Sequence, residues 1–245
     1  MTKLSVIIPF YNEVSSIKTA VDSAFQETSS HKFECEIIIV NDGAVSDTVI
    51  AEAIMRSIDV TIIKNRFGKG PGGARNTGIE FATGDLIAFL DADDCWVSGK
   101  LNAYLPLLQR GANFVCSGYL MGDLGPYVSP PKKIEQPIDI FKKRGIGTST
   151  VVTTKDLISG HRFRDLRFSQ DIDFWFQLAH SNLYSFSSVD APLAVYSVGG
   201  STRNKFVQAL SFYKVLKINN VSVIQRFLIM SGYMFNGVLK HYLRF

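Results

Sequence analysis

The chain has 245 residues, of which 46% are hydrophobic, 20% charged and 12% aromatic, with 19 glycines and 8 prolines. This composition excludes a disordered, collagen-like or low-complexity chain, and the length predicts one large α/β domain with an appendage. The three cysteines, Cys35, Cys95 and Cys116, cannot all pair and lack the spacing of metal ligands. They indicate reduced thiols in a cytoplasmic protein. The N-terminal apolar run is too short for a signal peptide and meets an acid at Glu13, so we do not expect secretion.

Charge is distributed unevenly along the chain. Residues 1–190 hold all 22 acidic residues and 19 of the 26 lysines and arginines, a net charge of −3. The last 55 residues hold no acid and seven basic residues, which are Arg203, Lys205, Lys214, Lys217, Arg226, Lys240 and Arg244. Such a basic tail predicts an anionic partner, either a membrane surface or a nucleic acid. Because the body of the protein is not basic, we do not expect it to bind nucleic acid.

The first hundred residues alternate short β-branched runs with helical patterns. Strands are expected over residues 4–8, where Pro9 would stop the run, and over 35–40, 60–63 and 85–90. Helices are expected over residues 14–26, 47–58 with Asp47 as the cap, and 74–81. Apolar strands separated by helices predict a parallel sheet covered on both faces. Later segments predict a strand over 114–119, a long loop over 122–147, a strand then a helix over 148–158, and a helix over 171–179.

From Ser201 the pattern is helical. It predicts an amphipathic segment with Phe206, Leu210 and Tyr213 on one face and the two lysines Lys214 and Lys217 on another. The longest apolar stretch in it, residues 227–239, is too short to span a bilayer. We therefore expect residues 206–245 to lie on the inner face of the cell membrane as a peripheral contact. The alternative is that these helices pack on the domain or on a second subunit.

Polar residues follow three of the predicted strands. The first strand leads into Pro9-Phe10-Tyr11-Asn12-Glu13, the second into Asn41-Asp42-Gly43, and the fourth into Asp91 and Asp93. Each acid alone is also consistent with a turn former or a helix cap. Because ligands of parallel sheets bind at the carboxyl ends of the strands, the three ends together predict a ligand site at one edge.

A glycine-rich loop offers a competing interpretation. Gly68-Lys69-Gly70-Pro71-Gly72-Gly73 matches G-x-G-x-x-G between a strand and a helix, with Asp91 or Asp93 about twenty residues further on. This pattern alone is typical of an NAD(P)-dependent dehydrogenase. We rank that interpretation second, because the loop follows the third strand and Pro71 removes an amide that a pyrophosphate would use. Paired acids at a strand end better suit Mn²⁺ or Mg²⁺, bound together with phosphate oxygens.

Four motifs occur in order along the chain, namely Pro9-Phe10-Tyr11-Asn12-Glu13, Asn41-Asp42-Gly43, Ala74-Arg75-Asn76-Thr77-Gly78 and Leu90-Asp91-Ala92-Asp93-Asp94. Together they resemble the successive motifs of inverting glycosyltransferase family 2, over roughly residues 1–200. The resemblance implies an α/β protein of GT-A fold. It implies a Rossmann-like nucleotide-binding half with a mostly parallel sheet over 1–120, an acceptor-binding half over 121–200, and C-terminal helices over 201–245.

In that family a nucleotide-sugar, most often a UDP-sugar, lies over the strand ends. The resemblance implies a nucleoside pocket lined by Pro9, Tyr11 and Glu13, with Asp42 receiving the base. It also implies Arg75 near the nucleotide, Asp91 at the ribose and the metal, and Asp93 at the metal.

The family also carries an acidic pair before an aromatic-rich helix, and the second acid of the pair is the general base. Asp171 matches this position, whereas Gln170 departs from the usual Glu. The alternative for Asp171 is a helix N-cap, and Asp173 is the second candidate for the base. Phe174 and Trp175 could stack on a sugar face or lie in the core.

The resemblance thus implies a metal-dependent inverting transfer of a hexose from a nucleotide-sugar to a carbohydrate acceptor. By analogy with the family, we expect the acceptor on a polyprenyl diphosphate, in the synthesis of a surface polysaccharide such as O-antigen. A non-catalytic sugar-nucleotide-binding protein, in which Gln170 marks a decayed site, is a further alternative beside the dehydrogenase.

Overall fold

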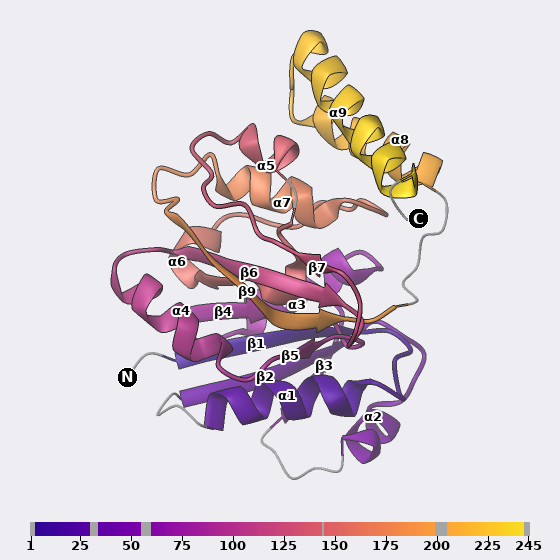
Figure 1. The fold of residues 1–245 in the computed structure, drawn as a ribbon. Helices are drawn as coiled ribbons and strands as arrows, with labels where there is room; N and C mark the ends of the chain where they lie inside the picture. The colour runs from indigo at the N-terminus through magenta and orange to yellow at the C-terminus, as the bar shows by residue number, and fades with distance from the viewer. Residues whose placement is uncertain (1–2, 30–33, 55–59, 144, 199–204, 243–245) are drawn as a thin grey trace.

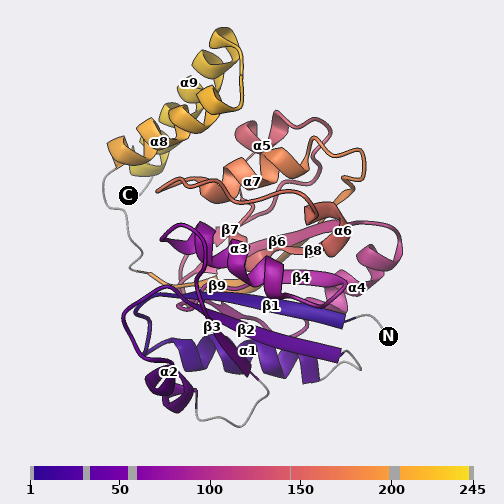
Figure 2. The same ribbon diagram turned by 180° about the vertical axis from the view of Figure 1, so that it is seen from behind.

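The computed structural model describes residues 3–29, 34–54, 60–143, 145–198 and 205–242, with residues 205 and 234–242 described as backbone only. One nine-stranded sheet forms the middle of the molecule, and helices cover both of its faces (Figures 1 and 2). The C-terminal helices lie at one end, beyond the helices that cover the sheet (Figure 1).

The strands are β1 (Lys3–Phe10), β2 (Glu34–Asn41), β3 (Val60–Lys64), β4 (Leu86–Phe89), β5 (Cys95–Trp96), β6 (Phe114–Met121), β7 (Tyr127–Val128), β8 (Val152–Thr154) and β9 (Phe186–Tyr196). Their order is β3-β2-β1-β4-β8-β6-β9-β5, with β7 paired to β6. β1 to β4 run parallel, β6 and β9 run in the same direction, and β5, β7 and β8 are antiparallel to their neighbours. The expectation of a mostly parallel sheet in an α/β fold is confirmed.

The first strand is longer than predicted, because it continues through Pro9 to Phe10. β4 pairs with β1 only as far as Ile7, so Pro9 has a strand neighbour on the β2 side alone. A proline is tolerated where a strand has an open side, since its missing N–H then removes no ladder hydrogen bond. The extension carries Phe10 to the level of Asn41, the last residue of β2.

The helices are α1 (Ile17–Ser29), α2 (Asp47–Ala53), α3 (Pro71–Phe81), α4 (Lys100–Gln109), α5 (Asp139–Lys142), α6 (Lys155–Ile158), α7 (Gln170–Leu178), α8 (Lys205–Ile218) and α9 (Val223–Tyr242), with a 3₁₀ turn at Thr148–Thr150. The cap of α2 is Ser46, which accepts a hydrogen bond from Val49 N, and not Asp47 as predicted. The expected end of that helix near residue 58 lies outside the described residues. α3 begins earlier than predicted because Pro71 suits the first helical position.

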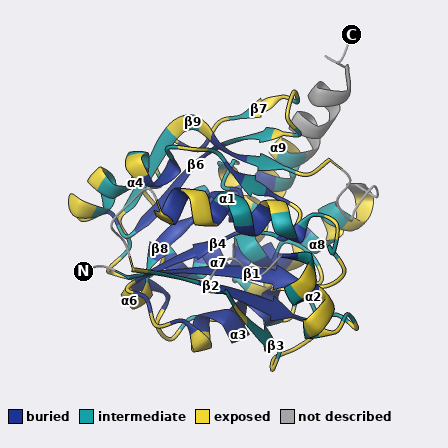
Figure 3. Cartoon of the chain, turned by 90° about the horizontal axis from the view of Figure 1, so that it is seen from below, coloured by how far each residue is buried: buried dark blue, intermediate teal, exposed yellow. Residues whose placement is uncertain are grey.

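Two hydrophobic cores lie on the two faces of the sheet. Alternate residues of β1 belong to different cores: Ile7 lies in the core that includes residues of α3, α7 and the C-terminal helices, whereas Val6 and Ile8 lie in the core that includes residues of α1, α2 and α4. Buried residues follow the central strands of the sheet, whereas β3, β7 and much of β9 are partly exposed (Figure 3). The prediction of a sheet covered on both faces is therefore confirmed, and one sheet runs through both predicted halves.

The C-terminal hairpin, which we define as α8 and α9, packs against α5 and α7. Phe212 and Tyr233 stack with ring centroids 5.1 Å apart, and Phe212 meets Phe141 of α5 edge-on at 6.0 Å. Asn219, just after α8, donates to Asp173 of α7 at 2.6 Å. The alternative that these helices pack on the domain is thus correct for one of their faces.

The predicted division of faces in α8 is wrong. Its buried face carries Phe212, Val215 and Leu216, while the exposed side also carries apolar residues, including Phe206 and Leu210. α8 is therefore apolar on both sides and not amphipathic. Of the seven basic tail residues, Lys214, Lys217 and Arg226 have described side chains, and those of Arg203, Lys205, Lys240 and Arg244 lie outside the described part. Among the described helices, none is both long and apolar enough to cross a bilayer.

Candidate active site

A cleft of about 930 Å³ opens where β1, β2 and β4 end. Its walls include every residue predicted for the nucleotide and the metal: Pro9, Tyr11, Glu13, Asp42, Arg75, Asp91 and Asp93. The sheet explains this gathering, because the carboxyl ends of neighbouring parallel strands meet at one edge. The fold thus brings residues from four distant motifs to one cleft.

The register of β1 and β2 determines the shape of the first wall. Asp42 N donates to Phe10 O at 2.8 Å, so the turn after β2 runs directly beside the segment after β1. A Cβ on Gly43 would lie 1.8 Å from the carbonyl oxygen of Tyr11, so only glycine fits there. Glu13 accepts hydrogen bonds from the amides of Tyr11 and Asn12 at 2.7 and 2.8 Å. These contacts hold the Tyr11 ring at the mouth of the cleft, where it is 53% exposed.

The motif Ala74–Gly78 lies on α3 and links the cleft to the core. Thr77 Oγ1 donates to Asn65 Oδ1 at 2.7 Å, and Asn65 Nδ2 donates to Asp42 Oδ1 at 2.7 Å. The second oxygen of Asp42 accepts from Gly70 N at 2.7 Å. Both oxygens of Asp42 are therefore held in place, and each has a further lone pair for a ligand.

Two further residues of this motif fix α3 against its neighbours. Asn76 exchanges two hydrogen bonds with the backbone of Phe163, at 2.8 and 2.9 Å. A Cβ on Gly78 would lie 2.4 Å from Ile7 Cγ2, so the absence of a side chain lets α3 approach β1 closely. The motif thus combines helix packing with the orientation of cleft residues.

Arg75 supplies positive charge on the floor of the cleft. Its guanidinium forms an ion pair with Asp91 and lies 5.5 Å from the centre of the Phe163 ring. The Arg75 side chain is only 5% exposed, so this pair is screened far less than a surface pair. Asp91 is thereby oriented by Arg75 at the end of β4.

Asp93 and Asp94 are crowded by negative charge. Burial raises the pKa of Asp93, and the neighbouring Asp91 carboxylate raises it further. Burial, together with the charge of Asp91, raises the pKa of Asp94 to about 7. Asp94 accepts from Ser149 Oγ at 2.6 Å and from Ser197 N at 3.0 Å, which marks it as a structural carboxylate.

The oxygen ligands in the cleft could supply part of the coordination shell of a hard divalent cation. The described residues include no group of three or more His, Cys, Asp or Glu able to enclose a metal by themselves. Asp91 and Asp93 nevertheless offer carboxylate oxygens on one wall, and a cation would relieve the repulsion that raises the pKa of Asp93. Mg²⁺ and Mn²⁺ use one or two carboxylates when phosphate oxygens and water complete the shell.

Asp171 lies in the first turn of α7 and does not line the nucleotide cleft. It lines a neighbouring cavity, and it is close enough to Arg75 and Asp91 for their charges to affect it. The cap position of α7 is Ser169, in a left-handed conformation with φ of 58°, so Asp171 is not the N-cap. Burial raises the pKa of its half-buried carboxyl group. A carboxylate of this kind is better able to accept a proton near neutral pH.

The second candidate base, Asp173, is in a different environment. It is fully buried and accepts hydrogen bonds from Arg164 at 2.9 Å, Asn219 at 2.6 Å and Gln177 at 2.9 Å. A carboxylate enclosed in this way cannot reach a substrate hydroxyl. Asp173 is therefore a structural link between α7 and the C-terminal hairpin.

The aromatic residues of α7 are part of the core. Phe174 and Trp175 are 0% and 1% exposed. Phe174 stacks on Phe163 with ring centroids 4.0 Å apart. Phe174 is therefore a core residue, and Trp175 is buried in the core while also lining the cavity beside Asp171.

The glycine-rich loop is explained by packing. Gly70 has φ of 115°, which favours glycine. A Cβ on Gly72 would lie 2.1 Å from Gln170 Oε1, and one on Gly73 would lie 1.7 Å from the carbonyl oxygen of Gly68. The glycines thus close the turn into α3 and make room for Gln170, the residue at the position where the family usually has Glu.

Lys69 and Arg167, to which the sequence motifs assign no role, add positive charge to the walls of the cleft. Tyr196 also lines the cleft, and its hydroxyl accepts from Ser149 N at 2.9 Å. Asn65 and Ser149 act behind the wall, by holding Asp42 and Asp94. Lys69 lies inside the glycine-rich loop, so its place in the sequence is a signal that could have found it.

The arrangement defines an α/β protein with a cleft at its strand ends, lined by a cluster of acids and by Lys69, Arg75 and Arg167. The model of the family described as Glycosyl transferase family 2 matches residues 5–190. The chain therefore belongs to glycosyl transferase family 2, and it is a glycosyltransferase by that membership. The dehydrogenase alternative built on Gly68–Gly73 is not supported.

Among curated relatives, a UDP-Glc:alpha-D-GlcNAc-diphosphoundecaprenol beta-1,3-glucosyltransferase, WfgD of Escherichia coli, is 26% identical over 97% of this chain and 94% of its own length. A GalNAc(5)-diNAcBac-PP-undecaprenol beta-1,3-glucosyltransferase of Campylobacter jejuni is 26% identical over 89% of this chain and 74% of its own. The crystal structure of Staphylococcus aureus TarS 1–349 in complex with UDP-GlcNAc covers 95% of this chain and 71% of its own, with a TM-score of 0.70 and 18% identity. This last likeness supports the GT-A fold.

The raised pKa of Asp94 predicts a pH-dependent stability. An acid whose pKa rises on folding holds its proton more tightly in the native state, so its contribution to stability is full below pH 4 and is lost as the pH rises towards about 7. Asp94→Asn removes this dependence. Urea unfolding in EDTA should show that the variant gains stability relative to wild type between pH 5 and pH 8. An equal difference at both pH values would contradict the assignment.

Proposed function

We propose that this family member transfers a hexose, with inversion, from a UDP-sugar to a hydroxyl of a glycan carried on a polyprenyl diphosphate. Such a reaction builds a surface polysaccharide of the O-antigen type. The observation that carries the proposal is the gathering of Asp42, Arg75, Asp91 and Asp93 in one cleft, with Asp171 beside it. The names of the relatives, which use UDP-Glc and undecaprenol-linked acceptors, make UDP-glucose the first donor to test.

Donor binding follows from the chemistry of the cleft. Residues 1–120 form the donor half, in which Pro9, Tyr11 and Glu13 line the nucleoside pocket. Asp42 accepts from the ring N–H of uracil through lone pairs that Asn65 and Gly70 leave open. The cations Lys69, Arg75 and Arg167 face the diphosphate.

Asp93, with Asp91, would hold Mn²⁺ or Mg²⁺ beside the diphosphate. A structural neighbour, the mannosyltransferase PcManGT, was solved with GDP-Man and Mn²⁺, which supports metal use in this fold. When bound, such a cation stabilises the charge that develops on the leaving diphosphate. Arg75 keeps Asp91 oriented towards the cleft, and Asp94 holds the segment after β4 through Ser149.

Asp171 acts as the general base in the acceptor half, residues 121–200. As the acceptor oxygen attacks C1 of the sugar, its proton passes to the Asp171 carboxylate. The new C1–O bond forms on the face opposite the diphosphate, the old C1–O bond breaks, and the diphosphate leaves with the electron pair. This single displacement needs only one base. Because the attack comes from the face opposite the leaving group, the anomeric configuration inverts.

Nucleotide binding should depend on the metal and on Asp93. Thermal unfolding midpoints measured with UDP, GDP, CDP and NADH, each with Mn²⁺ and with EDTA, should rise most with UDP plus Mn²⁺. Asp93→Ala should abolish the metal-dependent part of the rise and the transfer of sugar. Asp123→Ala, at an exposed acid outside the cleft, is the matched control and should behave as wild type. Stabilisation by UDP that EDTA leaves unchanged would contradict the metal site.

Loss of the base should affect turnover and leave donor binding intact. Asp171→Asn should lower kcat by about 10²- to 10⁴-fold, because it removes proton transfer in the transition state. UDP affinity should stay within twofold, as Asp171 lies outside the nucleotide cleft. Asp156→Asn, on the exposed start of α6, is the control. Full activity of Asp171→Asn would exclude Asp171 as the base. If the wild-type protein binds UDP but shows no turnover, the non-catalytic alternative is favoured.

The exposed face of the C-terminal hairpin supports peripheral contact with an anionic membrane. Val223, Ile224, Phe227 and Leu228 are 64% to 75% exposed and recur at helical spacing along the start of α9. Lys214 and Lys217 lie exposed on α8, and no acid follows Asp190 in the sequence. Exposed apolar side chains and exposed lysines on one hairpin suit the cytoplasmic leaflet, which would place the enzyme at the inner face of the membrane near a lipid-linked acceptor.

Removing two of these apolar side chains should weaken membrane binding. The double variant Ile224→Ser, Phe227→Ser should lower partitioning onto phosphatidylglycerol-containing vesicles at least tenfold, since burying one such side chain is worth roughly 1.5–3 kcal/mol. Leu124→Ser, at a fully exposed leucine far from the hairpin in sequence, is the control. Partitioning of the double variant equal to that of the wild type would contradict the membrane role. So would a wild-type dimer in vesicle-free buffer that the double variant dissociates, because these side chains would then bind a second subunit.

A further inference from the structure

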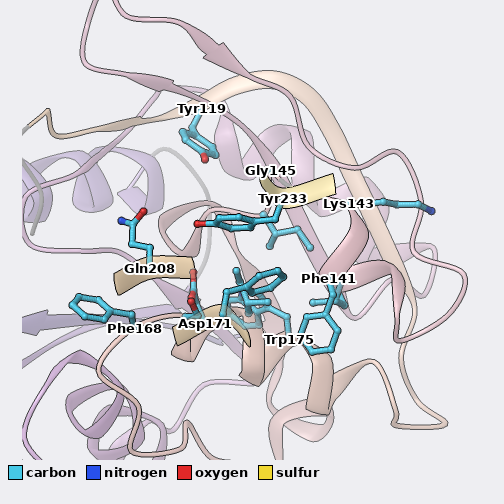
Figure 4. A pocket seen from close by; sticks show the side chains of 14 residues that line it. Tyr119, Phe141, Lys143, Gly145, Phe168, Asp171, Trp175, Gln208 and Tyr233 are labelled. Atoms are coloured by element: carbon cyan, nitrogen blue, oxygen red, sulfur yellow. The ribbon is translucent and has the colours of Figure 1, made fainter. Parts of the chain in front are cut away.

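A second cavity, of about 360 Å³, lies between α5, α7 and the C-terminal hairpin (Figure 4). Asp171 lines it, together with aromatic residues from several elements. Among the described residues, those that line this cavity differ from those that line the nucleotide cleft. Asp171 faces the cavity and lies close enough to the cleft for the charges of Arg75 and Asp91 to affect it.

The lining of this cavity suits a carbohydrate. Rings of Tyr119, Phe168, Trp175 and Tyr233 line it, and the hydroxyls of the two tyrosines and the Gln208 amide add polar groups to its lining (Figure 4). Sugars present both apolar C–H faces and hydroxyls, and aromatic rings with a few placed polar groups bind the two together. The volume is at the small end of ligand pockets, which span roughly 300–1,000 Å³, so it suits one or two sugar rings.

The C-terminal hairpin supplies part of this wall in a fixed position. Ser211 of α8 donates to the carbonyl oxygen of Phe168 at 3.1 Å, and Asn219 donates to Asp173 at 2.6 Å. Asp173 lies on the same helix as Asp171, only two residues further on. The hairpin is thus tied to the helix that carries the base, and the side chains it contributes are held relative to that carboxylate.

Gln208 and Tyr233 lie outside residues 5–190, the part of the chain that matches the family model. The matched part supplies most of the donor cleft and Asp171, whereas Gln208 and Tyr233 belong to the remaining C-terminal segment. Resting on the proposed function, we infer that Gln208 and Tyr233 bind the terminal pyranose of the acceptor and are specificity-determining residues for it. The hairpin then has two faces, one towards the acceptor sugar and one towards the solvent.

The test separates acceptor binding from donor chemistry. The probe is a synthetic α-N-acetylglucosaminyl diphosphate with a short alkyl chain, patterned on the acceptor in the relatives' names. Its binding is measured by saturation-transfer NMR in the presence of UDP and Mn²⁺, and its KM in transfer from UDP-glucose. Gln208→Ala and Tyr233→Phe should each raise the acceptor Kd and KM about tenfold, while kcat changes less than threefold. UDP affinity and the slow hydrolysis of UDP-glucose should be unchanged.

Leu210→Ala, on the exposed side of α8, is the matched control and should leave every value unchanged. If both variants bind and use the acceptor as wild type does, the inference is wrong while the proposed function stands. If the wild type binds UDP but neither binds the probe nor transfers sugar to it, both the inference and the acceptor assignment fail. A loss of UDP affinity in the two variants would also overturn the inference, because it would indicate a general structural defect.

Discussion

Crowding of negative charge at the end of β4 is the constraint on which the site depends. Asp91, Asp93 and Asp94 fall within four residues, and Glu13 also lines the same cleft. The fold compensates in two ways: Arg75 pairs with Asp91, and burial raises the pKa of Asp94 while Ser149 and Ser197 donate hydrogen bonds to its oxygens. Asp93 faces the cleft without an ion pair among the described contacts, and a diphosphate would add still more negative charge. A bound cation would offset the charge of Asp93 and of the diphosphate together.

A buried lysine supports this arrangement from behind. Lys100 is fully buried and donates to the carbonyl oxygen of Thr150 at 2.9 Å, and its amino group lies 5.2 Å from the centre of the Trp96 ring. Burial lowers its pKa to about 7. The turn that it anchors carries Ser149, which accepts from Asp91 N at 3.0 Å and donates to Asp94. The position of the acids thus depends on a 3₁₀ turn almost sixty residues further along the chain.

The sequence predicted the position of cleft residues correctly where a motif directly follows a strand. Apolar strands and the acids that follow them were enough to predict the sheet edge, because parallel strands align their carboxyl ends. Asn65, Ser149 and Arg167 were not predictable in this way, since each reaches the cleft through tertiary packing. Pro9 shows the same limit, because only the short pairing of β4 explains why the strand continues through a proline. The roles assigned to Asp171 and Asp93 stay predictions until the variants are measured.

The hairpin was the least predictable part, because its composition fits both packing and membrane contact. The structure indicates that these are compatible, since α8 buries Phe212, Val215 and Leu216 and still exposes Phe206 and Leu210. One apolar side of α8 packs towards α5 and α7, and the other is exposed. A lipid-linked acceptor has a sugar at one end and a lipid at the other, so its enzyme needs one surface for the sugar and one for the membrane. A hairpin that contacts the sugar through Gln208 and Tyr233 and the bilayer through Ile224 and Phe227 would meet both with one rigid element.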